Sequence, residues 1–113
     1  MKFTLAAILL AFSINSYALD YRDAHNCEGE ADDAHTLYLI KIGSTGTQAD
    51  GPDSVARVKA KEMQIHLDGS AKIRDSRYKS IEVYMVNYVF DSATGGEDAE
   101  RAIYAFCMDT LSR

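Results

Sequence analysis

The sequence predicts an all-α fold: a small bundle of about four helices stapled by one disulfide. Turn-forming residues divide the chain into four segments, and the first and last segments carry apolar residues at helical spacing. One cysteine lies on each of these two apolar stripes. The breaks fall at Gly43–Gly46, Gly51–Pro52, Asp68–Ser70 and Thr94–Gly96.

The first 18 residues have the pattern of a secretory signal peptide. Lys2 provides a positive start, residues 3–14 form an apolar core, and Ser16 and Ala18 are the small residues that a signal peptidase reads. A core helix of a cytosolic protein would explain the apolar run but not this order of regions. We therefore predict a signal peptide over residues 1–18 and a single mature domain over 19–113, located in the periplasm or secreted.

The segment from Asp20 to Ile42 is predicted to be a helix. Gly43 stands where a helix C-terminal glycine is expected. A strand over Thr36–Ile42 is the rival interpretation, because part of this stretch is a short apolar run. Helical spacing joins Cys27, Ala31, Ala34, Tyr38 and Ile42 into one stripe.

The two middle segments are less clearly patterned. A proline at a first helical position favours a helix from Pro52 to about Leu67. The run Ile81–Phe90 is apolar all round, and its length favours a helix packed centrally between the two amphipathic ones. The alternative is an α+β fold with a short hairpin within residues 62–91, turning at Asp68–Gly69.

The last segment has the clearest helical pattern. Thr94 and Glu97 fit a capping box, in which Thr94 is the N-cap and Glu97 reaches back to it. The apolar residues that follow recur at i, i+3, i+4, i+7 and i+8, and they are Ala99, Ala102, Ile103, Phe106 and Cys107.

Cys27 and Cys107 are predicted to form a disulfide. The chain has two cysteines, and an even number in an exported domain indicates a disulfide rather than a metal site. Each cysteine lies on the apolar stripe of its own segment. These stripes bury their apolar surface most directly by facing each other, which brings the two sulfurs together.

Several features together resemble a group of small exported proteobacterial proteins. These features are a cysteine at the start of the first mature helix, the stretch Ile81–Val89, the sequence Gly96-Glu97-Asp98-Ala99, and the end Tyr104-Ala-Phe-Cys107. The group is all-helical, with one cysteine near each end, and its plan is similar to that of the amidase-immunity proteins of type VI secretion. The resemblance implies an all-α fold and assigns no functional residue.

Few residues point to chemistry. His25, Glu28 and Asp32 could share one face of the first helix and hold a divalent metal, but a solvated polar face is the favoured interpretation, so we assign no metal site and no cofactor. His35 is expected to be half-buried, and His66 receives no role. The adjacent acids Asp32-Asp33 and Glu97-Asp98 are expected to be caps or surface residues. With no nucleophile motif and both cysteines in a disulfide, no catalytic residue and no enzyme activity are predicted.

Charge and hydropathy exclude some partners. The formal net charge is −5 and becomes −6 once Lys2 leaves with the signal peptide, so nucleic-acid binding is not expected. No long apolar run follows residue 18, so no membrane anchor is expected. Tyrosine is enriched at protein interfaces, and tyrosine is the most frequent aromatic residue of this chain.

The sequence therefore predicts a small exported protein-binding module, such as a periplasmic inhibitor or immunity protein. One alternative is a structural or envelope-stress protein that acts by self-association or by binding unfolded clients. A second alternative is an exported metal-binding protein. The sequence leaves the oligomeric state open.

We predict that the exported form begins at Leu19 or within about two residues of it, because Ser16 and Ala18 occupy the positions read by the signal peptidase. The intact mass of the exported protein measures this directly. A dominant species that retains residues 1–18 would contradict the prediction.

Overall fold

The computed structural model contains four helices and describes residues 2–45 and 51–113, with side chains described for residues 21–43 and 54–113. The helices are α1 (Lys2–Thr45), α2 (Gly51–Ala71), α3 (Arg77–Asp91) and α4 (Gly96–Leu111). No strand occurs in this described part of the chain. The predicted all-α fold is confirmed, and the hairpin alternative is wrong because residues 62–91 form the end of α2, a turn and all of α3.

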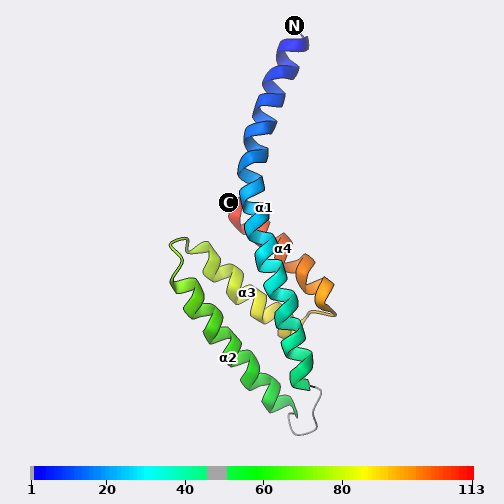
Figure 1. The fold of residues 1–113 in the computed structure, drawn as a ribbon, viewed down its shortest axis with the longest axis vertical. Coiled ribbons are helices and arrows are strands. Elements are labelled where there is room, and N and C mark those ends of the chain that lie inside the picture. The colour runs from blue at the N-terminus through cyan, green and yellow to red at the C-terminus, as the bar shows by residue number, and fades with distance from the viewer. Residues whose placement is uncertain (1, 46–50) are drawn as a thin grey trace.

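The helices pack mainly as two pairs. α1 lies along α4, and α2 lies along α3 (Figure 1). α3 also contacts both α1 and α4. This confirms the prediction of a central third helix, and it explains why the Ile81–Phe90 run is apolar all round: the helix is contacted from three directions.

Two predicted helix ends differ from the structure. Gly43 does not end α1, which continues to Thr45, and Asp68-Gly69 does not turn the chain, because α2 continues to Ala71. The turn comes later, where Lys72 and Ile73 donate backbone hydrogen bonds to the carbonyls of Gly69 and Ser70. A single glycine costs a helix only about 1 kcal/mol, which the surrounding turns can offset.

The start of α4 corrects the predicted capping box. The N-cap is Gly95, and no side chain caps it. Asp98 instead reaches back: its Oδ2 accepts hydrogen bonds from the Thr94 backbone N–H at 3.0 Å and from the Tyr88 hydroxyl at 2.9 Å. The first of these bonds is the main reason that the pKa of Asp98 is lowered. Asp98 therefore joins the end of α3 to the start of α4.

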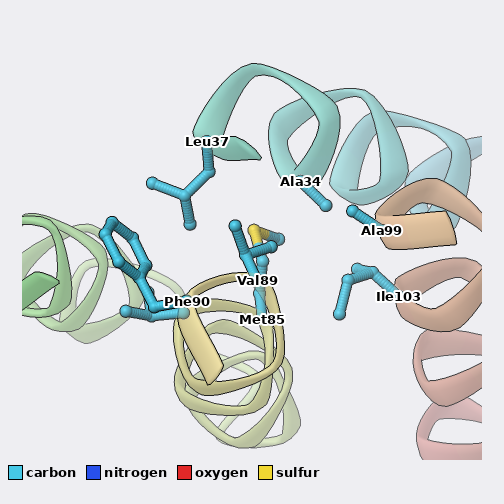
Figure 2. Close-up of a cluster of buried hydrophobic side chains, with 8 residues drawn as sticks. Ala34, Leu37, Met85, Val89, Phe90, Ala99 and Ile103 are labelled. Atoms are coloured by element: carbon cyan, nitrogen blue, oxygen red, sulfur yellow. The ribbon is translucent and has the colours of Figure 1, made fainter. Parts of the chain in front are cut away.

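The main apolar core lies between α1, α3 and α4 (Figure 2). Leu37 is 2% exposed and points toward Phe90 and Val89 of α3, so Leu37 is the core residue of this turn, rather than the predicted Tyr38 or Ile42. Tyr38 is half-buried at the edge and Ile42 is 44% exposed. The cluster comprises Ala34, Leu37, Met85, Val86, Val89, Phe90, Ala99 and Ile103.

Cys27 of α1 and Cys107 of α4 form the predicted disulfide, with their Cα atoms 5.6 Å apart. Both cysteines are fully buried and pack with Ile81 and Leu111 in a second apolar cluster. Arg77 adds a polar tie at the same end, since its guanidinium donates to the Leu111 carbonyl at 2.8 Å. The stripes on the first and last helices therefore face each other, as the sequence predicts.

The first half of α1 extends away from the other three helices (Figure 1). Every residue described as buried lies at Cys27 or beyond it. Cleavage after Ala18 would therefore leave the described core intact. Over its described residues, none of the four helices combines the length and apolar character needed to cross a membrane.

Reduction of the disulfide is expected to destabilise the protein strongly. Cys27 and Cys107 close a loop with a sequence separation of 80 residues, and such a closure stabilises a fold by about 4 kcal/mol through loop entropy. Cys27→Ser and Cys107→Ser should each lower the free energy of unfolding by a comparable amount, measured in urea. The double variant should be no less stable than the worse single variant, and additive losses would contradict this expectation.

Candidate functional site

A groove of about 320 Å³ lies between α1 and α4. From α1 it is lined by Glu28, Ala31 and Asp32, which recur at helical spacing. From α4 it is lined by Glu100, Arg101 and Tyr104. Ala31 is 7% exposed, and its small side chain leaves the space that forms the groove.

The groove lies where α1 and α4 are joined by both a disulfide and a hydrogen bond. Cys27 precedes Glu28, and Cys107 lies one helical turn after Tyr104, so the disulfide fixes the two walls at one end. Toward the other end, His35 Nδ1 and Glu100 Oε1 are hydrogen-bonded at 2.5 Å between α1 and α4. The walls of the groove are therefore held at both ends before any ligand binds.

The charge of the groove is predominantly negative. Its lining contains the three carboxylates of Glu28, Asp32 and Glu100, and one cationic side chain, Arg101. Glu28 and Asp32 are exposed to solvent, so both can contact a ligand directly. Tyr104 is half-buried and offers an aromatic wall beside these acids.

This combination suits a cationic group such as an ammonium or a guanidinium. Carboxylates accept charge-assisted hydrogen bonds from ammonium or guanidinium groups. An aromatic ring adds a favourable cation–π contact of about 0.5–1 kcal/mol at an exposed site. The lining therefore places acidic and aromatic groups where a cation could contact both.

The structure separates the three residues considered for a metal. Glu28 and Asp32 line the groove, whereas His25 is exposed outside it. Among the described residues, no group of three or more His, Cys, Asp or Glu is placed to hold a metal ion. His35 is half-buried as expected, and its partner is Glu100.

The remaining tyrosines lie mostly at the edge of the core. Tyr84 stacks on Phe106, with ring centroids 3.8 Å apart and planes 4° apart, and it lies 5.9 Å from Tyr88. A shallow hollow beside Tyr84 is lined by residues of α3 alone. Tyr21 is 66% exposed. The groove between α1 and α4 differs from these features because it combines charge, an aromatic ring and two helices.

One cluster was not predicted from the sequence. Glu30, His66 and Glu82 come together where α1, α2 and α3 meet, with Asp33 nearby. A signal for it exists in the sequence, since Glu82 is the one carboxylate within the largely apolar run Ile81–Phe90. A charged residue in such a run requires a buried partner.

No protein-family model, curated protein or solved structure matches this chain.

Gly96 is expected to be required for the hydrogen bond between His35 and Glu100 that borders the groove. A Cβ at this position would lie 2.6 Å from His35 Cε1, closer than packed atoms allow. Gly96→Ala should therefore displace the imidazole and destabilise the protein by about 1 kcal/mol or more. In a His35→Ala background the same change should instead stabilise, because alanine is the better helix former.

Urea unfolding of the two single variants and the double variant measures this reversal of sign. If Gly96→Ala changes the free energy of unfolding equally in both backgrounds, the contact with His35 is not the reason that alanine is unfavourable at position 96.

Proposed function

We propose that this chain is an exported protein-binding module, of the inhibitor or immunity-protein kind, with no catalytic activity of its own. Its groove between α1 and α4 receives a lysine or arginine side chain of the partner protein. The observation that carries the proposal is the acidic and aromatic lining of that groove on a disulfide-bonded seam. A binding site held rigid in advance loses less entropy on association.

Charge and compartment support the same function. The net charge of the full chain is −5, or −6 without residues 1–18, and a negative charge accelerates encounter with a basic protein surface. A disulfide persists in oxidising compartments and is rare in the cytosol. The pattern of residues 1–18 supports export into such a compartment.

Charge reversal in the groove tests the proposal. Asp32→Lys places a cation where the partner's cation is proposed to bind, and like-charge contact at an interface costs several kcal/mol. We expect wild type to capture one stoichiometric partner from the exported fraction of its native cell, and Asp32→Lys to bind that purified partner at least about tenfold more weakly. Calorimetry at two salt concentrations measures the affinity and its screening.

Asp68→Lys is the matched control. Asp68 is exposed on α2, away from the groove, and the substitution changes the net charge by the same amount. Equal affinities for both variants would rule out the groove as the binding site. Capture of many proteins in substoichiometric amounts, or self-association in light scattering, would instead favour the structural or client-binding alternative.

A further inference from the structure

Three ionisable side chains from three helices meet away from the groove. His66 of α2 donates a hydrogen bond through Nδ1 to Glu82 Oε2 of α3. Glu30 of α1 shares a second hydrogen bond with Glu82. The His66 and Glu82 side chains are only 15% and 10% exposed, so water screens their interaction little.

The hydrogen bonds of this cluster depend on protons carried by Glu30 and by His66. Two carboxylates that share a hydrogen bond must hold a proton between them. Burial raises the pKa of Glu30 to about 8, with further contributions from its hydrogen bond to Glu82 and from the charges of Glu82 and Asp33. Burial would also raise the pKa of Glu82, but hydrogen bonds from His66 and Glu30 outweigh burial and lower this pKa.

The hydrogen bond to Glu82 raises the pKa of His66, although burial opposes it. Below about pH 8, Glu30 is therefore a neutral acid that donates to the Glu82 carboxylate, and the raised pKa of His66 favours its cationic form. The second oxygen of Glu30, Oε2, is buried without a hydrogen-bond partner. A charge on Glu30 would therefore be poorly compensated.

The groups around the cluster cannot supply the positive charge that these protons provide. Asp33 faces it from α1, Glu62 faces it from α2, and Tyr78 faces it from α3. All three are acids. Among the described residues that act on the cluster, His66 is the one that can carry positive charge.

α2 depends on this cluster more than the other helices do. Ser70 is the one residue of α2, within its described positions 54–71, that is buried. The apolar side chains of α2 that reach the core, Val55, Val58 and Met63, are only partly buried. Its other described ion pair, Lys59–Asp91 at 2.8 Å, has a largely exposed carboxylate and contributes little.

We propose that Glu30, His66 and Glu82 form a proton-operated latch that holds α2 against α1 and α3. Protons on Glu30 and His66 close the latch, and loss of both releases α2 while the disulfide keeps α1 and α4 together. Release would uncover the apolar surface of α1 and α3 that α2 covers. The latch involves neither the groove nor its lining residues, so it goes beyond the proposed binding function.

The direction of the pH dependence follows from the pKa shifts. Glu30, Asp33 and His66 have raised pKa values in the folded state, so their stabilisation is greatest at low pH and is lost as the pH rises. For Glu30 this loss runs from about pH 4.5 to about pH 8. Glu82 has a lowered pKa, so its contribution is lost as the pH falls below about 4.5. The latch should hold best in mildly acidic solution and weaken as the pH rises toward about 8, where Glu30 loses its proton.

Hydrogen exchange between pH 5 and pH 9, corrected for intrinsic rates, tests the latch on the wild-type protein. The protection of α2 amides should fall by about tenfold or more across this range relative to α4 amides, because opening α2 requires the loss of protons that the closed state retains. Parallel loss of protection in α2 and α4 would overturn the proposal, since it would indicate global unfolding.

The Glu30→Gln variant provides a second test of the latch. A glutamine amide donates to Glu82 at every pH, so the pH dependence of α2 protection should become shallower by up to about tenfold per pH unit. Glu28→Gln removes an exposed carboxylate two residues earlier on α1 and should keep the wild-type profile. A wild-type profile in Glu30→Gln would also overturn the latch.

Discussion

The disulfide between Cys27 and Cys107 is the constraint on which the arrangement of the helices depends. It joins the second half of α1 to α4, with a sequence separation of 80 residues. Once these two helices are fixed side by side, their small residues Ala34 and Ala99 meet closely, and the apolar side chains of α3 fill the space that remains (Figure 2). A domain of this size has a shallow core, so a covalent link contributes a large share of its stability.

Stabilisation is distributed unevenly over the four helices. α1, α3 and α4 share the two clusters of fully buried apolar residues, whereas α2 is held by partly buried apolar contacts and by polar side chains such as His66. Apolar burial is nearly independent of pH, but a hydrogen-bonded ionisable cluster is not. The same fold therefore has one rigid side, which carries the groove, and one side whose attachment varies with protonation.

The groove illustrates how far sequence reasoning reaches. Helical spacing places Glu28 and Asp32 on one helix face, and in the structure both line one groove. Their partners Glu100, Arg101 and Tyr104 belong to a helix far along the chain, and helical spacing carries no information about which helix packs opposite. His25, the third residue of the metal hypothesis, is exposed and does not line this groove.

The sequence by itself determined the two outer helices, the central place of the third segment and the disulfide. These features follow from local periodicity and from burial of the apolar stripes on which the cysteines lie. Only the tertiary structure decided that Asp68-Gly69 continues a helix, that Leu37 rather than Tyr38 enters the core, and that Glu30, His66 and Glu82 meet. The reason is physical: a local pattern shows which face of a helix is buried, but the crossing of the helices decides which side chains from distant positions share that buried space.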